Sequence, residues 1–353
     1  TGTINVGDNA IGIYGYNVNN NKDIKAGDNG VAIYTQGSGT PSTTVNLNSG
    51  STITVGKNQA VGVYAVGSGQ NINANAGSSM TIGDNSFGIV NVGSGNTVTS
   101  NTTNPVTLGT DAVYIYQNDN TGTINNYTPL TSTGDRNYGL YGNGTINNNA
   151  VINFTTGNGN VGMYATTGGI ATNNTGGVIK VGASNTAAKE FGVGMATGYY
   201  NEATGTISNQ GTIINHGTIE VSQPKSMGMY AVGSGSKAIN YGNINLSGSE
   251  TVGMYIDRGA EGENWGTIQT TAGGLTGVKG VYVANGGYIK NYGTISIGAT
   301  DSKSAGIWTD NADHAEENAT GVHPITGASK TGTSTPAMKV ATASDEKTMG
   351  GVS

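Results

Sequence analysis

The chain has 353 residues, a net charge of −6, 61 glycines, 10% charged residues and no cysteine. Its arginines are Arg136 and Arg258 alone, and it has no basic patch, which excludes a nucleic-acid-binding protein. The lack of cysteine excludes disulfide frameworks and thiolate metal sites, and it is typical of an exported chain. The sequence contains no signal peptide and no apolar run of membrane-spanning length.

A short phrase recurs along the chain: an aliphatic residue, usually Gly, another aliphatic residue and usually Tyr, as at 161–164. Twelve copies begin at Ile11, Val31, Val61, Phe87, Val113, Tyr138, Val161, Phe191, Met227, Val252, Lys279 and Ala305. Most successive copies lie roughly 20 to 35 residues apart, which indicates stacked supersecondary units rather than one globular core.

Two further segments alternate with this phrase. One is Gly-Thr-Ile followed by a polar and an aliphatic residue, as at 217–221, and the other is a weaker apolar segment, as at 237–240. Turns rich in Gly, Asn and Asp separate them, and these residues tolerate positive φ. The pattern predicts an all-β chain folded as a right-handed parallel β-helix of about twelve coils, with roughly 25 residues and three short strands per coil. Such a β-helix would be a rod on the order of 55 Å long.

The phrase also predicts which side chains face the core. Successive side chains of a strand point to opposite faces, so we expect Val161, Met163 and Ala165 to point inward and Tyr164 to point outward. Stacked aliphatic residues would then form a continuous core, because each coil places one above its equivalent.

Asparagine precedes an aromatic residue and Gly at Asn240, Asn264 and Asn291. His216 takes the aromatic place in a fourth copy of this motif, so we expect it to be a turn residue. Aligned asparagine side chains can hydrogen-bond along a stack, which predicts an amide ladder.

The interval from Met195 to Tyr230 is long and contains extra Gly-Thr-Ile phrases, so an additional partial coil is expected there. The insertion at 198–202 places Tyr199 and Tyr200 in a turn, and insertions in repeat proteins often fall on the binding face. The pattern ends at Trp308. We therefore expect a β-helical fragment over 1–308, an irregular cap or a linker to a further module over 309–353, and a monomeric fragment of a longer protein.

Phrases such as Asn291-Tyr292-Gly293-Thr294-Ile295, together with Ala305-Gly306-Ile307-Trp308, resemble the passenger regions of large fusobacterial type V autotransporter adhesins of the RadD-like family. The resemblance covers roughly residues 1–308. It implies a surface-exposed passenger rod that mediates attachment between bacteria or to host cells. It also implies outer-membrane anchoring through a C-terminal translocator β-barrel that lies outside this sequence, and it implies no catalytic residues.

The few charged and histidine-bearing segments are weak candidates for chemistry. His314 lies in an acidic run with Asp313 and Glu316, for which we favour a solvated loop over a metal site. We expect no metal site, no cofactor and no enzyme.

A dense charged patch inside the repeats combines Arg258 with Asp257, Glu261 and Glu263. Paired carboxylates can hydrolyse glycosidic bonds, so a carbohydrate-active enzyme is the third-ranked alternative, although a surface loop is the preferred interpretation.

The tyrosines are the main candidates for binding. If the aromatic places of the phrase align outward, they form a stripe suited to sugars or protein partners; alternatively, the rings stack on one another and only stabilise the rod. The candidate binding residues, including the insertion, are Tyr14, Tyr34, Tyr64, Tyr116, Tyr141, Tyr164, Tyr199, Tyr200, Tyr230, Tyr255, Tyr282 and Trp308. The first hypothesis is an adhesin that binds a host or bacterial cell-surface protein or glycan, and the second is a passive stalk that presents a distal binding tip.

Overall fold

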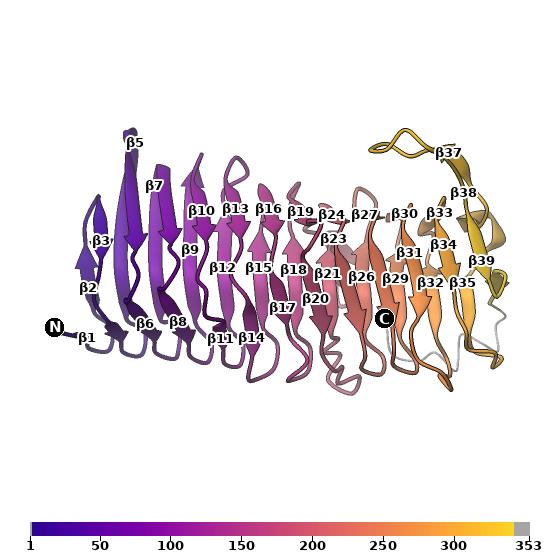
Figure 1. The fold of residues 1–353 in the computed structure, drawn as a ribbon, viewed down its shortest axis with the longest axis horizontal. Coiled ribbons are helices and arrows are strands. Elements are labelled where there is room, and N and C mark those ends of the chain that lie inside the picture. Colours follow the sequence, from indigo (N-terminus) through magenta and orange to yellow (C-terminus); the bar gives the residue numbers. More distant parts are fainter. Residues whose placement is uncertain (1, 342–353) are drawn as a thin grey trace.

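The computed structural model describes residues 2–341, apart from the side chain of Pro41. Its strands lie side by side along the long axis of an elongated molecule (Figure 1). Almost all of the strand pairs are parallel, and each strand pairs with its equivalent in the next coil. The chain is therefore a right-handed parallel β-helix of about 11 turns, which confirms the predicted fold class. Within residues 2–341, no helix is long and apolar enough to cross a membrane.

The first sheet has 13 strands and contains the segment of each coil that precedes the tyrosine phrase, such as the Gly-Thr-Ile phrase at 217–221. Its members are β1 (Ile4–Val6), β4 (Ile24–Ala26), β6 (Thr52–Val55), β8 (Ser79–Ile82), β11 (Val106–Leu108), β14 (Leu130–Ser132), β17 (Val151–Asn153), β20 (Val178–Val181), β25 (Thr218–Val221), β28 (Asn243–Leu246), β31 (Thr267–Thr270), β34 (Thr294–Ser296) and β39 (Thr333–Thr335). The Gly-Thr-Ile phrases at 122–124, 144–146 and 211–213 lie instead on the second sheet.

The second sheet has 23 strands and holds both other segments of each coil. The tyrosine phrases lie on β2 (Ile11–Tyr14), β5 (Val31–Leu47), β7 (Val61–Ala74), β9 (Phe87–Ser94), β12 (Val113–Asn118), β15 (Tyr138–Gly142), β18 (Val161–Ala165), β21 (Val193–Thr197), β26 (Met227–Val232), β29 (Val252–Asp257), β32 (Lys279–Ala284) and β35 (Ala305–Thr309), with β40 (Lys339–Val340) after them. The third segments form β3 (Val18–Asn20), β10 (Thr97–Ser100), β13 (Thr123–Asn126), β16 (Thr145–Asn148), β19 (Ile170–Asn173), β24 (Thr212–Asn215), β27 (Lys237–Asn240), β30 (Glu261–Asn264), β33 (Tyr288–Asn291) and β36 (Ala315–Glu316).

In two early coils the tyrosine phrase and the third segment join into one strand. These strands are β5, with 17 residues, and β7, with 14 residues. In later coils, turns separate the two segments into two strands.

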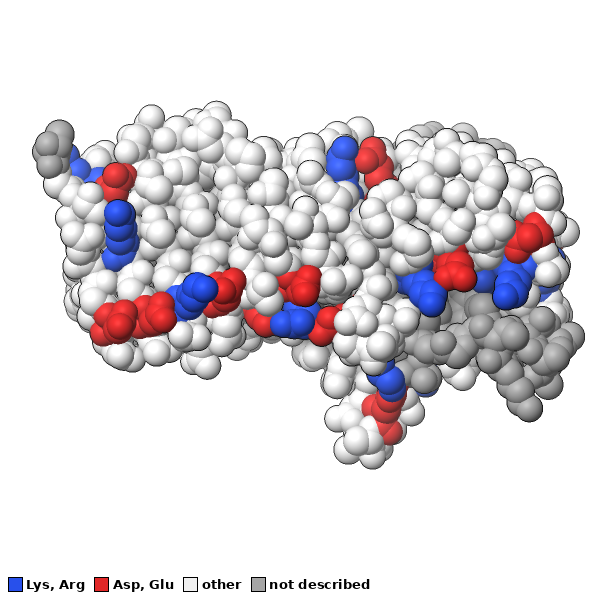
Figure 2. All heavy atoms as spheres, turned by 90° about the horizontal axis from the view of Figure 1, so that it is seen from below, with Lys and Arg blue, Asp and Glu red and all other residues white. Residues whose placement is uncertain are grey.

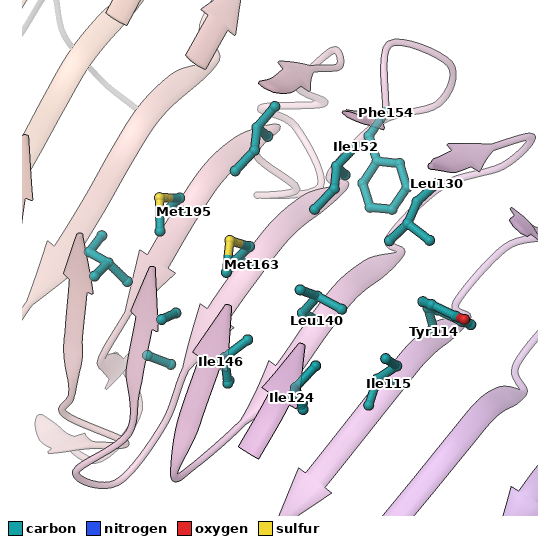
Figure 3. Close-up of a cluster of buried hydrophobic side chains, with 14 of the residues drawn as sticks. Tyr114, Ile115, Ile124, Leu130, Leu140, Ile146, Ile152, Phe154, Met163 and Met195 are labelled. Carbon is teal, nitrogen blue, oxygen red and sulfur yellow. The ribbon is translucent and has the colours of Figure 1, made fainter. Parts of the chain in front are cut away.

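The core consists of columns of aliphatic side chains, one residue per coil. Ile115, Leu140, Met163 and Met195 lie in register on successive phrase strands, and each is fully buried. Figure 3 shows this column beside side chains from the first sheet, such as Leu130. Because each side chain packs against its own equivalent above and below, the sequence period itself builds a continuous core.

The facing prediction was right for Met163 and Ala165, which are fully buried in the main core, and wrong for Val161. Val161 packs instead in an outer cluster with Tyr164. The reason is Gly162, where a Cβ atom would lie 2.6 Å from the carbonyl oxygen of Gly194 and 2.7 Å from Ile179 of the first sheet. The backbone approaches the core at this glycine, so strict alternation fails between the first and third positions of the phrase.

A ladder of hydrogen-bonded asparagine side chains runs through the interior, at the ends of the third strands of successive coils. Each buried asparagine donates a hydrogen bond through its Nδ2 to the Oδ1 of the next, at 2.8–2.9 Å. The members are Asn126, Asn148, Asn173, Asn215, Asn240, Asn264 and Asn291, all fully buried. Buried amides need such partners, and the predicted asparagine ladder is present.

The long interval after Met195 contains an antiparallel hairpin in addition to the regular coil. β22 (Tyr199–Asn201) pairs with β23 (Thr206–Ser208) outside the two large sheets, so the expected partial coil is absent from this interval. The eighth copy of the phrase also lies two residues later than predicted, because Val193 and Met195 are in register with Val161 and Met163.

The segment after Trp308 adds one strand at each of the three strand positions of the coil. β36 pairs with β33, β39 with β34 and β40 with β35. A short 3-10 helix, η1 (Ala312–His314), precedes β36, and an antiparallel pair, β37 (Thr320–Val322) and β38 (Ser329–Thr331), projects from this last coil. The rest of the expected cap or linker, 342–353, lies outside the described residues.

Candidate binding surface

The fourth place of the phrase forms a column on the outer face of the second sheet, in register from coil to coil. In the first coils, the rings of Tyr14 and Tyr34 lie 5.4 Å apart and those of Tyr34 and Tyr64 lie 5.7 Å apart, both nearly parallel. We call this column the tyrosine ladder, and its members are Tyr14, Tyr34, Tyr64, Tyr116, Tyr141, Tyr164, Tyr230, Tyr255, Tyr282 and Trp308. All lie in the same register column, so their expected alignment is present.

Stacking decides which part of each ring a partner can reach. Tyr141 stacks on Tyr116 at 5.6 Å and on Tyr164 at 5.1 Å, so both faces of its ring are occupied by neighbours. Rings that are stacked on both sides, those of Tyr34 and Tyr141, therefore present ring edges and hydroxyl groups outward, not ring faces. A sugar cannot stack flat on such a ring, whereas a partner can contact the edges and accept hydrogen bonds from the hydroxyls.

Exposure falls from the first coils to the last. Tyr14 is 62% exposed, while Tyr255 is 4% and Trp308 is 5% exposed. Burial raises the pKa of Tyr141, Tyr164 and Tyr230, so their hydroxyl groups stay protonated at neutral pH. The accessible part of the ladder is its N-terminal part.

Two coils interrupt the ladder. Val90 takes the aromatic place on β9, and Ala196 takes it on β21. At the second interruption the chain leaves the coil as the β22–β23 hairpin, and the Tyr164 hydroxyl donates a hydrogen bond of 2.7 Å to the carbonyl oxygen of Gly198. The two interruptions divide the ladder into three parts, and the hairpin begins at the second of them.

The hairpin carries the other two candidate tyrosines, and they differ. Tyr199 is 52% exposed and free to contact a partner. The ring of Tyr200 is covered by the Arg258 guanidinium, whose carbon lies 3.7 Å from the ring centroid. Arg258 also forms an ion pair with the buried Asp257. Tyr200 is thus a structural contact that fixes the hairpin to the rod.

The carboxylates that could have hydrolysed a glycosidic bond each contact a different partner. Asp257 is 1% exposed and accepts a hydrogen bond from Asn285 at 2.7 Å in addition to its arginine partner. Glu261 pairs with Lys237 at 3.0 Å, and Glu263 accepts a hydrogen bond from the Trp265 indole at 2.7 Å. Burial raises the pKa of Asp257. Each carboxylate has its own structural partner, which speaks against paired catalytic carboxylates. The expected surface loop was wrong, because Asp257 ends β29 and is buried, while Glu261 and Glu263 lie on β30.

Other sites for chemistry are sparse in residues 2–341. No group of three or more His, Asp or Glu side chains there could hold a metal ion. His314 pairs with Asp310 at 2.9 Å. A shallow depression of about 420 Å³ on the outer face of the first sheet includes Lys180 and Glu220, which are ion-paired at 3.3 Å.

Charge is sparse on the surface as well. Figure 2 shows charged side chains gathered in narrow rows, with most of the visible surface uncharged. Charged residues of neighbouring coils form ion pairs, as in Lys57–Asp84 at 2.8 Å and Arg136–Asp111 at 2.7 Å. The face of the described residues seen in Figure 2 offers neither a basic track for nucleic acid nor a strongly acidic area.

A second aromatic ladder lies at the corner after the third segment. His216 stacks on Tyr241 at 4.9 Å, and Trp265 stacks on Tyr292 at 3.8 Å. We call these four residues the corner ladder. These aromatic residues are absent from the binding residues that the sequence predicts, although the Asn-aromatic-Gly motif repeats them at the same spacing as the asparagines.

These features define a parallel β-helix with ladders of repeated side chains. A family model described as the BigA third pectate lyase-like domain matches residues 20–265, and the chain belongs to this family. A solved structure of a TibC-catalyzed hyper-glycosylated TibA fragment is 14% identical over 87% of this chain and 99% of that chain, with a TM-score of 0.19. A search of curated proteins finds no match. The resemblance to RadD-like fusobacterial adhesins stays a prediction.

Proposed function

We propose that this chain is the rod of a surface-exposed autotransporter passenger and that it acts as an adhesin without enzymatic activity. The observation that carries the proposal is the tyrosine ladder. Its first rungs lie on the outer face of the second sheet, and Tyr14 is 62% exposed. Membership of the BigA third pectate lyase-like family supports an exported β-helical passenger.

The chemistry of the ladder indicates how it would hold a partner. A row of ring edges and hydroxyl donors, repeated at the spacing of the coils, offers many weak contacts along one line. This arrangement suits a host or bacterial cell-surface protein or an extended glycan that lies along the rod. The separate partners of Asp257, Glu261 and Glu263 speak against a hydrolytic role for the same rod.

The test compares binding of the fragment with binding of two variants. The purified chain is labelled and applied to bacterial and host cells and to a glycan array. Tyr34→Ala combined with Tyr64→Ala removes two stacked rungs, while Tyr16→Ala removes a tyrosine that is 58% exposed but lies outside the ladder. We expect the double variant to lose binding and the Tyr16 variant to keep it.

The other outcomes separate the alternatives. A wild-type fragment that binds nothing across the panel would identify a passive stalk. Binding that survives in the double variant but is lost on Tyr199→Ala would move the contact from the ladder to the hairpin. Cleavage of an array glycan by the wild type, abolished by joint replacement of Asp257 and Glu261, would overturn the non-enzymatic assignment.

A further inference from the structure

The arm, residues 320–331, folds back over the corner ladder. It contains β37, β38 and the turn between them, and Figure 1 shows it in yellow at the C-terminal end of the rod. The coil on either side of it is fixed to the rod, because Asn291 donates hydrogen bonds to the carbonyl oxygens of Glu317 at 2.9 Å and Thr333 at 3.1 Å. The arm itself contacts the aromatic rings of the rod through His323 and Gly321.

One histidine of the arm makes the contact. The His323 ring is 7% exposed and lies 5.3 Å from the Tyr241 ring and 5.6 Å from the Trp265 ring. Gly321 adds a close approach, since a Cβ atom there would lie 2.9 Å from the Tyr292 ring and 3.1 Å from the Trp265 ring. The arm thus covers Trp265, which is 5% exposed.

This contact depends on a neutral imidazole. The Nδ1 of His323 accepts hydrogen bonds from the backbone N–H groups of Ile325 and Thr326, both at 3.2 Å. Protonated Nδ1 is a donor and cannot accept either bond. Protonation of His323 would therefore remove both hydrogen bonds of the turn, beside the ring that contacts the rod.

A second histidine responds in the same direction. His216 stacks on Tyr241, the ring that His323 also contacts. Burial and the neighbouring His323 lower the pKa of His216. A histidine whose pKa is lowered in the docked state favours docking above its ordinary value of about 6.5, and this contribution is lost as the pH falls below that value.

The other ionisable groups around this contact are few. Tyr241 and Tyr292 belong to the corner ladder, and Glu263 accepts the hydrogen bond of the Trp265 indole. Lys290 and Glu316 are in register with Glu263 on the following coils, and Lys330 lies on β38. Among these groups, His216 of the corner ladder and His323 of the arm, the two histidines are the ones whose residue type ordinarily titrates between about pH 5 and about pH 8.

We propose that the arm is an acid-released clasp that covers the corner ladder at neutral pH and uncovers it when His323 and His216 are protonated. Release exposes Trp265 and Tyr292 as an aromatic surface, while the coils beneath stay folded because their strand pairs do not involve the arm. The inference does not depend on the proposed adhesive function.

The test uses Trp265 as its own reporter. The chain has two tryptophans, so Trp308→Phe leaves Trp265 as the single indole. Fluorescence emission and acrylamide quenching are followed from about pH 7.5 to about pH 5, with the β-sheet circular dichroism recorded in parallel. We expect a reversible red shift and stronger quenching on acidification, approaching those of a variant whose arm is replaced by a short glycine linker, with unchanged circular dichroism.

Three variants identify the groups responsible. His323→Phe combined with His216→Tyr keeps aromatic rings at both places but removes both titrations together with the Nδ1 acceptor, so its fluorescence and quenching should no longer change with pH. His314→Gln changes the remaining histidine, which pairs with Asp310 away from the clasp, and should leave the response intact. A response that persists in the double variant, disappears in Glu263→Gln alone or is absent from the parent protein would overturn the clasp.

Discussion

The inner asparagine ladder and the outer tyrosine ladder run along the same coils, but hydrogen bonds hold the first and ring contacts hold the second. Each interior asparagine of the ladder donates one hydrogen bond to a neighbour and accepts one from the other at 2.8–2.9 Å, so a missing rung leaves two polar groups without their ladder partners. The tyrosine ladder is interrupted at Val90 and Ala196 without breaking the β-helix. A repeat sequence can therefore place one column under strict chemical constraint and leave another free to vary.

The largest expected loss of stability comes from a charge on the core side of β18, compared with the same charge on its outer side. Met163→Asp puts an uncompensated charge into the fully buried core and should destabilise by about 4 kcal/mol or more. Val161→Asp, in the outer cluster, should cost about 1–2 kcal/mol. Urea unfolding followed by circular dichroism measures both. Equal losses would mean that the outer cluster is as constrained as the core.

Removing one rung of the inner ladder is the next effect. Asn215→Ala leaves the Nδ2 of Asn173 and the Oδ1 of Asn240 without their ladder partners, which should cost about 1–3 kcal/mol. Asn147→Ala is the matched control, since its amide bonds Asn125 at 3.0 Å on the half-buried outer face. Its loss should stay below about 1 kcal/mol. If both variants melt together, burial does not distinguish the two kinds of asparagine pair.

The third prediction concerns the stability of the protein at high pH, which should depend on the buried Tyr114. Burial raises the pKa of Tyr114 from 10.0 to about 12, although Ser100 bonds its hydroxyl at 2.5 Å. A raised pKa favours folding below pH 10 and loses this contribution as the pH rises towards 12, a loss of roughly 2–3 kcal/mol.

The unfolding free energy of the wild type should therefore fall in alkali relative to that of Tyr114→Phe, which has no ionisable hydroxyl at this position. Tyr16→Phe, at an exposed position, should follow the wild-type curve. Parallel curves for Tyr114→Phe and wild type would contradict the link to this hydroxyl.

The smallest effect is expected on the outer ladder. Tyr34→Ala removes stacking on Tyr14 and Tyr64 and should cost about 1 kcal/mol. Thermal unfolding of this variant also supports the binding test, because a small shift means that lost binding reflects a lost contact surface. A loss as large as that of Asn215→Ala would make the tyrosine ladder a structural element first.

Much of the fold could be predicted because the period of the sequence is also the period of the structure. Met163 and Met195 share a place in the phrase and a place in the core, and Tyr164 faces outward as alternation requires. The prediction for Val161 failed because alternation assumes an even pleat, and the close approach at Gly162 shifts the preceding residue outward. The hairpin and the arm were missed because each occurs once, and a pattern search detects what repeats.

By itself the sequence determined the all-β class, the coil, the asparagine ladder and the alignment of the tyrosines, since each follows from residues that recur at one spacing. Tertiary structure alone decided that stacking hides the faces of the tyrosine rings, that Arg258 fixes the hairpin through Tyr200, and that His323 closes over Trp265. These contacts join residues far apart in the chain. Their geometry depends on how the coils stack, which no local pattern encodes.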